Sequence, residues 1–213
     1  MRLTQYIRSR CEIYLILIIG FLLRVYRLDG PSLWFDELLT LGSMDLPLIQ
    51  IVKGAATLPF PPLYHIVTHL WVKTFGISEF SLRFPSLIFS LLSIFLIFKL
   101  AKELFGRQVG LLAALLLVIS PYSIGYAREA KMYSMLWFFG LLSFYFFYKF
   151  TRDNKKRDLA LYILSTLASI YTLYAGLFFI IVQNAVFFLL FFRRPQLKKW
   201  LLAQAIIILL YLP

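Results

Sequence analysis

The sequence predicts an all-α protein that crosses a membrane several times. Of its 213 residues, 61% are hydrophobic and only 15% are charged, whereas a soluble domain carries about 25% charged residues. The hydrophobic residues collect in long runs, and short segments between them hold nearly all the charge. A polytopic bundle of transmembrane helices accounts for both observations, because about 20 apolar residues in a helix cross the hydrocarbon core.

About seven apolar runs are predicted to be spans. They cover residues 13–28, 84–100, 108–124, 132–150, 159–174, 175–192 and 200–213. The stretch 159–192 is nearly unbroken and would be about 50 Å long as one helix, too long for a core of about 30 Å. Basic clusters flank it on both sides, so we predict that it crosses twice, with a turn at Ala175–Gly176.

The basic residues predict an orientation with the N-terminus in the cytoplasm. Lys and Arg are retained on the cytoplasmic side, and this assignment places most of them there. The net charge of +12 therefore does not indicate nucleic-acid binding, since no continuous polar domain carries it. The basic start followed by an apolar run is interpreted as an uncleaved first helix, because no small-residue cleavage site follows. Cys11 is the only cysteine, which excludes an intrachain disulfide.

The first extracytoplasmic loop, residues 29–83, is predicted to contain an amphipathic helix at 61–76. Its apolar residues Leu63, Ile66, Val67, Leu70 and Trp71 share one face. The opposite face carries His65, Thr68, His69 and Lys73. A helix of this length is too short to span, so we expect it to lie in the membrane interface with its polar face in water.

An acidic pair, Asp36 and Glu37, lies in PSLWFDELLT just after the first span. Carboxylates beside the hydrocarbon boundary are costly to keep ionised unless they are solvated, paired or used in chemistry. The alternative is a solvated pair that caps an interfacial helix. Adjacent residues face different sides of a helix, so only one of them can be the main reacting group.

A cationic pair, Arg128 and Lys131, lies in YAREAKMY at the second predicted outside loop. In a helix these two residues share one face, and Glu129 and Tyr133 share another. Cations on the outer surface depart from the positive-inside tendency, so they are candidates for holding an anionic head group. The alternative is neutralisation by Glu129 within a belt of tyrosines.

Other polar residues have simpler interpretations. His65 and His69 have the i, i+4 spacing of metal ligands, but an aqueous helix face explains them better. Arg24 and Arg27 are predicted to extend from the end of the first span toward water. Glu79 and Arg83, four residues apart, are predicted to form an ion pair.

The order of these segments resembles the C-type (GT-C) membrane glycosyltransferases, in the branch of protein O-mannosyltransferases and the lipid A aminoarabinose transferase. The matching segments are LWFDELLT, PPLYHIVTHLWVKTFGISEFSLRFPS, LAKELFGRQVGLLAALLLVISP and YAREAKMYSM. The resemblance covers roughly residues 20–150, and later spans match in hydropathy alone. It implies that the chain is the N-terminal part of a GT-C fold, with the C-terminal region of the family missing.

The resemblance also implies a reaction. A sugar would move from a polyprenyl-phosphate donor to a protein, lipid or glycan acceptor on the extracytoplasmic face of the plasma membrane, by inverting displacement. Asp36 would be the general base, with Glu37 beside it in the catalytic pair. The substrate-binding candidates are Arg128, Lys131, Glu129, Tyr133, Tyr64 and His65. No cofactor is assigned, although Glu37 and Glu129 could hold a divalent metal.

Two other interpretations remain. A transporter or channel subunit would place charged groups at mid-membrane or show an inverted repeat, and the sequence shows neither. The chain ends in YLP at the expected outer end of the last span, so it could also be an inactive fragment of a longer enzyme.

Overall fold

The computed structural model describes residues 2–54, 60–191 and 195–211, with side chains described from residue 11 onward. Within these ranges every regular element is a helix. The helices are α1 (Arg2–Val25), α2 (Phe35–Gly42), α3 (Leu48–Gly54), α4 (Leu63–Phe75), α5 (Glu79–Phe105), α6 (Arg107–Ile119), α7 (Pro121–Ala127), α8 (Tyr133–Asp153), α9 (Lys156–Thr172), α10 (Gly176–Phe191) and α11 (Leu197–Tyr211). The all-α class predicted from the sequence is therefore observed.

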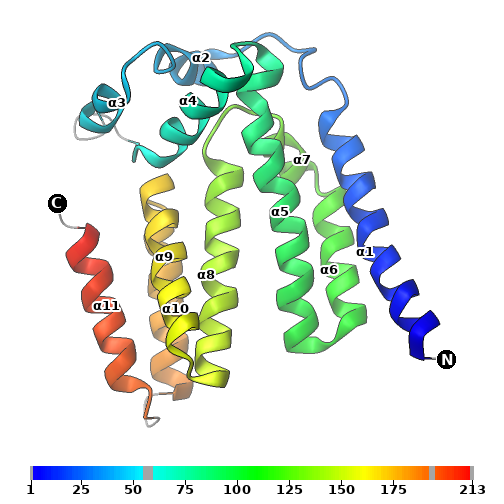
Figure 1. Ribbon diagram of the computed structural model, residues 1–213, viewed down its shortest axis with the longest axis vertical. Helices are drawn as coiled ribbons and strands as arrows, with labels where there is room; N and C mark the ends of the chain where they lie inside the picture. Colours follow the sequence, from blue (N-terminus) through cyan, green and yellow to red (C-terminus); the bar gives the residue numbers. More distant parts are fainter. Residues whose placement is uncertain (1, 55–59, 192–194, 212–213) are drawn as a thin grey trace.

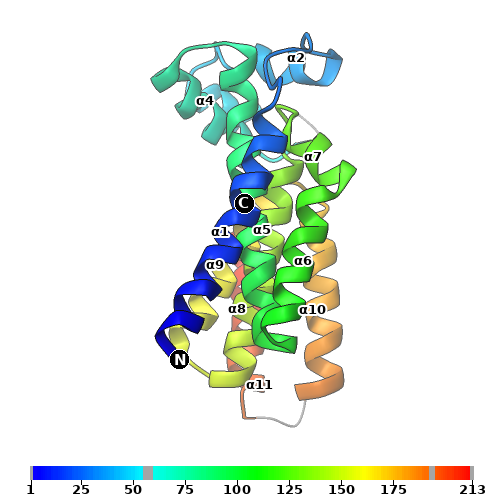
Figure 2. The same cartoon turned by 90° about the vertical axis from the view of Figure 1, so that its right-hand side faces the viewer.

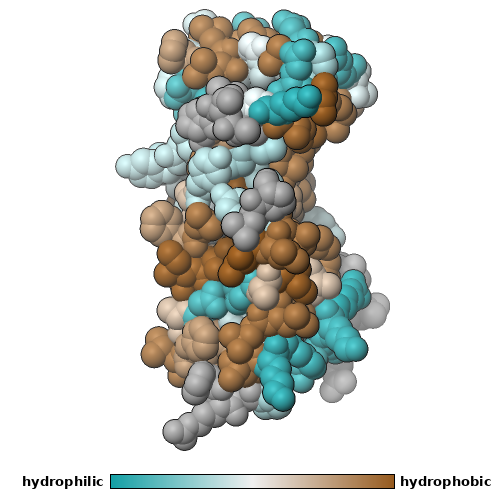
Figure 3. Space-filling model, turned by 90° about the vertical axis from the view of Figure 1, so that its left-hand side faces the viewer, coloured by the Kyte–Doolittle hydropathy of each residue, from teal (hydrophilic) through white to brown (hydrophobic). Residues whose placement is uncertain are grey.

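The long helices form a bundle, and three short helices cover one of its ends. Helices α1, α5, α6, α8, α9, α10 and α11 run side by side along the long axis, while α2, α3 and α4 lie across the top (Figure 1). The N-terminus lies at the opposite end from this cap, as the view turned by 90° also shows (Figure 2). One face of the bundle is largely hydrophobic in its middle part and more hydrophilic at both ends (Figure 3).

Length and hydropathy support fewer spans than the seven predicted. Among the described helices, only α5 is long and apolar enough to cross a bilayer by itself, and α6 with α7 would qualify together as one broken span. Helix α10 is apolar but shorter. Helices α9, α10 and α11 have 17, 16 and 15 residues, below the roughly 20 that a straight span needs. The count of seven spans thus stays a prediction.

Backbone turns set the alternating course of the bundle. Gly106 has a positive φ of 93° between α5 and α6, a conformation that favours glycine. Asn154 ends α8 in the left-handed region with φ 52°, a role that Asn fills more readily than most residues. The long apolar stretch 159–192 is divided between α9 and α10, which are separated at residues 173–175.

A buried arginine holds the break between α6 and α7, which are bent by 63°. Arg24 on α1 has an exposed fraction of 0%, so the prediction that it extends toward water is wrong. Its guanidinium makes five hydrogen bonds within the bundle. The acceptors are the hydroxyls of Ser90 and Ser123 and the carbonyls of Gly20, Leu117 and Val118. Carbonyls at a helix C-terminus lack intrahelical partners, and Arg24 supplies donors to two of them.

Replacing Arg24 by Leu is expected to destabilise the bundle. The substitution leaves buried carbonyls of α6 without donors, at a cost of about 1–3 kcal/mol for each such group. Thermal unfolding in detergent should show a clearly lower midpoint for Arg24→Leu. Arg27→Gln is the control, because the Arg27 side chain is exposed and should leave the midpoint nearly unchanged. Equal midpoints for the two variants would contradict the bracing role of Arg24.

Candidate functional site

The acidic pair lies in the first turn of α2, in the cap over the bundle. Trp34 is the N-cap residue, and its backbone N–H donates to Glu37 Oε2 at 3.4 Å, as in a capping box. Carboxylates in the first turn also complement the positive end of the helix dipole. The local sequence WFDE therefore favours a helix start here, and this start directs Asp36 and Glu37 to different sides of α2.

Glu37 forms a buried, two-pronged ion pair with Arg83 on α5. Arg83 Nε donates to Oε1 at 2.8 Å and Nη2 donates to Oε2 at 2.7 Å. The exposed fractions of the two residues are 0% and 3%. Arg83 also donates to the carbonyls of Leu28, Pro31 and Ser32. One ion pair thus joins α5, α2 and the loop that follows α1.

The predicted partner of Arg83 was Glu79, and this pairing is not observed. Residues four apart on a helix can pair, but the guanidinium is directed to Glu37 instead. Burial favours this choice, because a buried charge needs a partner and further hydrogen bonds to satisfy its remaining donors. Sequence spacing alone could not identify a partner 46 residues away.

Helix α2 is also clamped to the segment between α7 and α8. The Ala130 N–H donates to Glu37 Oε1 at 2.8 Å, and the Thr40 hydroxyl donates to the Ala130 carbonyl at 2.9 Å. The side chains of Glu37 and Thr40 lie on the same face of α2, since the two residues are three positions apart. The two predicted loops, one acidic and one cationic, are therefore in direct contact.

The surroundings of Glu37 keep it ionised. Burial opposes ionisation, but the hydrogen bonds from Arg83 and the Ala130 N–H outweigh it and hold the pKa of Glu37 below the ordinary value for a glutamate. With four donors on its two oxygens, this carboxylate has no capacity left for a substrate or a metal. Glu37 is a structural anchor in this geometry.

Asp36 differs from its neighbour. It is half-buried, and among the described residues no hydrogen bond or ion pair occupies its carboxylate. Its charge nevertheless acts on Glu129, Lys131 and Tyr133, so it faces the segment that follows α7. Within the described residues, the fixed Glu37 thus has beside it a carboxylate that no protein group occupies.

The cationic pair is split by a turn. Residues 128–132 lie between α7 and α8, so the shared helical face predicted for Arg128 and Lys131 does not form. Arg128 donates to the Arg27 carbonyl at 3.2 Å in an exposed position. Lys131 is 97% removed from solvent, with an exposed fraction of 3%, and its Nζ lies 5.4 Å from the Phe60 ring centre.

The two groups beside the acidic pair have shifted pKa values. Burial, reinforced by the charges of Glu37 and Asp36, raises the pKa of Glu129. Burial lowers the pKa of Lys131, although the three nearby carboxylates oppose this. Shifted pKa values of this kind are frequent at functional sites.

A cavity of about 530 Å³ opens beside these residues. Its polar lining comes from Glu37, Arg83, Arg128, Glu129 and Arg27, together with apolar residues of the loop after α1 and Trp34. The size falls within the range of about 300–1,000 Å³ typical of small-molecule sites. Three arginines against two glutamates leave this cavity suited to an anionic group. Of the three arginines, Arg83 is buried, Arg128 is half-buried and Arg27 is exposed.

Helix α4 does not have the wet polar face that its sequence predicts. Thr68 and His69 are buried, with exposed fractions of 0% and 5%, whereas Leu70 is 51% exposed. The reason is that α4 packs against α5 and α9, which an isolated hydropathy pattern does not contain. Tyr64 is also buried and lies 3.1 Å from the Ser86 hydroxyl, which in turn donates to the Lys131 carbonyl.

His65 has a defined hydrogen-bonding role next to this cluster. The Ser43 hydroxyl donates to the Thr40 carbonyl at 2.7 Å and lies 2.9 Å from His65 Nδ1. Because the hydroxyl proton is used, Nδ1 must be the donor, which leaves Nε2 as an acceptor. Burial, assisted by the charge of Lys131, lowers the pKa of His65 to about 4, so the ring is neutral at physiological pH.

No metal site is evident in the part of the chain that the structure describes. No group of three or more His, Cys, Asp or Glu side chains is arranged to hold an ion there. His65 and His69, which have the spacing of metal ligands, belong to no such group, and Glu37 is fully engaged by donors.

Sequence reasoning missed how two residues organise the site. Arg83 and Thr40 join segments far apart in the chain. The available signal was the cost of an arginine beside a membrane span, which implies a partner. That cost indicates that a partner exists, but it does not identify which residue the partner is.

Comparison with known proteins identifies the family of this chain. The model of the family described as dolichyl-phosphate-mannose-protein mannosyltransferase matches residues 60–213. An uncharacterized protein of Aquifex aeolicus (strain VF5) is 32% identical over 151 residues, which cover 70% of this chain and 30% of that protein. Two Bacillus subtilis (strain 168) proteins, named "Putative mannosyltransferase" YycA and YkcB, are 28% and 26% identical over 42% and 48% of this chain.

The match to this family model places the chain among the families of C-type (GT-C) membrane glycosyltransferases. More particularly, the chain belongs to the dolichyl-phosphate-mannose-protein mannosyltransferase family. It spans 30% of the length of the Aquifex relative and 13% and 14% of the two Bacillus proteins.

Proposed function

We propose that this chain forms the acceptor-activating and phosphate-binding part of an enzyme that transfers a sugar from a polyprenyl-phosphate donor to a hydroxyl acceptor. The observation that carries the proposal is the contrast within the acidic pair. Glu37 is locked by four donors, whereas the carboxylate of Asp36 beside it has no hydrogen bond or ion pair to any residue that the structure describes. The acceptor could be a protein, a lipid or a glycan.

In the proposed reaction, Asp36 removes the proton of the acceptor hydroxyl. The acceptor oxygen then forms a bond to the anomeric carbon while the bond from that carbon to the phosphate oxygen breaks. The phosphate leaves with the electron pair, and its anionic state makes a strong general acid unnecessary. A single displacement of this kind inverts the anomeric configuration.

Arg128 is proposed to bind the donor phosphate. It lines the cavity beside Glu37, and a guanidinium suits the two-pronged recognition of phosphate. Positive charge there stabilises the leaving group as negative charge develops on it. Lys131, Glu129 and Tyr133 are all close enough to feel the charge of Asp36, and they would orient the sugar or the acceptor.

Helix α4 would contribute by hydrogen bonding. The free Nε2 of neutral His65 could accept a hydrogen bond from a sugar or acceptor hydroxyl. Tyr64, which is buried against Ser86, is assigned a supporting rather than a binding role. We propose further that the site faces the extracytoplasmic side of the plasma membrane, with the N-terminus in the cytoplasm and multiple spans between.

Transfer from polyprenyl-phosphate mannose in membranes is the direct test of this proposal, and Arg128→Gln probes the phosphate role. The variant should lower kcat/KM for the donor by about 10²-fold, because one charge-stabilising contact to the leaving group is lost. Lys73→Gln, which removes an exposed cation from the same cap, should retain normal kcat/KM. Unchanged kinetics in Arg128→Gln would remove the phosphate-binding role.

A further inference from the structure

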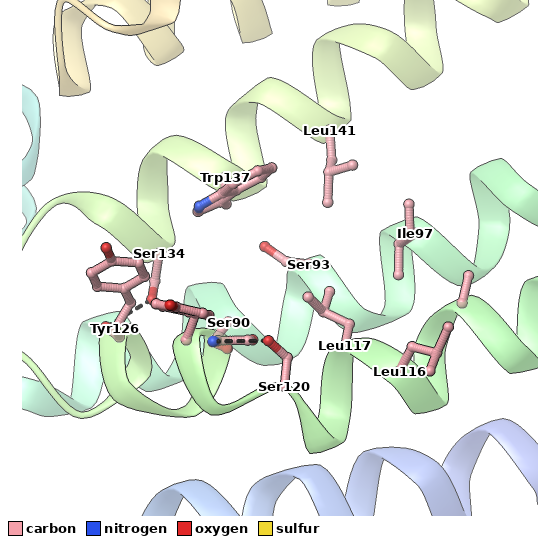
Figure 4. A pocket seen from close by; sticks show the side chains of 13 residues that line it. Ser90, Ser93, Ile97, Leu116, Leu117, Ser120, Tyr126, Ser134, Trp137 and Leu141 are labelled. Carbon is pink, nitrogen blue, oxygen red and sulfur yellow. Dashed lines mark hydrogen bonds between the residues drawn. The ribbon is translucent and has the colours of Figure 1, made fainter.

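A second cavity, of about 580 Å³, lies within the bundle on the other side of α7. Helices α5, α6, α7 and α8 enclose it, with Trp137 and Leu141 of α8 facing Ser93 and Leu117 (Figure 4). Its lining is mostly apolar. None of the lining residues is among those assigned to sugar transfer. Its volume suits a ligand.

The lining changes from polar to apolar along the long axis of the bundle. The end near the cap carries the hydroxyls of Ser90, Ser120, Ser123 and Ser134, together with Tyr122 and Tyr126. The far end is formed by Ile97, Ala113, Leu116 and Leu141. This order follows from the course of α5, α6 and α8 between the cap and the opposite end (Figure 1). A ligand that fits has one polar end and one apolar chain.

Arg24 gives the polar end a preference for negative charge. Its guanidinium lies directly behind the wall and donates to the hydroxyl oxygens of Ser90 and Ser123. Among the described residues, no carboxylate lies within ion-pair distance of Arg24, so its charge is not neutralised by the protein. A buried charge normally acquires a partner, and an anion at this wall would provide one.

The two serines are oriented to bind such an anion. Because each hydroxyl oxygen accepts from Arg24, its own proton is directed elsewhere, and the described residues offer no acceptor for it. These protons can therefore be donated into the cavity, and hydrogen bonds to ionised groups are about twice as strong as neutral ones. Phosphate oxygens are acceptors, so they can receive the protons of these two hydroxyls.

We propose that this cavity binds one anionic phospholipid of the surrounding membrane, with its phosphate at Ser90 and Ser123 and an acyl chain along Ile97, Leu116 and Leu141. The lipid would fill the space beside the α6–α7 break and neutralise Arg24. This site is separate from the donor-phosphate position proposed at Arg128, and its occupancy does not depend on sugar transfer.

The test counts lipid retained by the purified protein in detergent, using native mass spectrometry. Phosphatidylglycerol should be retained at a concentration at least about tenfold lower than phosphatidylcholine, because only the former carries a net charge. Ala113→Trp, which fills the apolar end, should reduce phosphatidylglycerol retention about tenfold. Leu112→Trp is the matched control, since Leu112 is 55% exposed on the same helix and should not alter retention.

The polar end is tested separately. Ser123→Ala should weaken phosphatidylglycerol retention and leave phosphatidylcholine unaffected, whereas Ser93→Ala, whose hydroxyl is bonded to the Phe89 carbonyl, should change neither. Equal retention of the two lipids, or normal retention in Ala113→Trp, would overturn the proposal. Binding of polyprenyl phosphate that displaces phosphatidylglycerol and requires Arg128 would also overturn it, because the cavity would then belong to the donor.

Discussion

Asp36→Asn is expected to reduce sugar transfer by at least about 10²-fold while leaving the protein folded. Proton removal by a positioned carboxylate contributes about 10²–10⁴-fold to a rate, and an amide cannot accept that proton. The substitution preserves size and removes a carboxylate without a hydrogen bond or ion pair to the described residues, so the cap should keep its structure. The measurement is the initial rate of transfer from polyprenyl-phosphate mannose in membranes at matched protein levels.

Asp45→Asn provides the control for this experiment. Asp45 is an exposed acid between α2 and α3. Asp45→Asn therefore changes the charge of the cap by the same amount as Asp36→Asn but leaves the proposed base in place. Its rate should equal that of the unmodified protein. If Asp36→Asn retains the full rate, Asp36 is not the base, whatever the donor sugar proves to be.

The main effect of Glu37→Gln is expected to be a loss of folding stability. Removing one partner of a buried ion pair costs about 3–5 kcal/mol, because the other charge stays buried without compensation. Here the uncompensated charge would be Arg83, and the contact to the Ala130 N–H would also weaken. Thermal unfolding in detergent should show a large decrease in midpoint, and any loss of activity should follow the loss of folded protein.

The same ion pair predicts a pH dependence. The pKa of Glu37 is lower in the folded protein than its ordinary value of 4.5, so its contribution to stability is fully present above that pH. The contribution is lost as the pH falls through the lowered folded value. Glu79→Gln is the matched control, since Glu79 is exposed and begins α5. A stable Glu37→Gln variant with the acid sensitivity of the parent would contradict the anchoring role.

The sequence alone determined the class of structure and indicated which segments to propose as the site. Long apolar runs have a simple physical meaning, because backbone groups in hydrocarbon must be satisfied within a helix. The segments LWFDELLT and YAREAKMY also stood out, because charge near a membrane surface requires an explanation. These local signals predicted an all-α chain and a site that includes Asp36 and Arg128.

Only the tertiary structure decided which charged groups are partners and which are free. Glu37 and Asp36 are neighbours with similar chemistry, and their difference comes from Arg83 and Ala130, which lie 46 and 93 residues away. Arg24 and the polar face of α4 were assigned to water because their hydropathy was considered helix by helix. Packing reversed both assignments. Hydrogen-bond partners on other helices offset the cost of burying Arg24, whereas Thr68 and His69 are buried because α4 packs against α5 and α9.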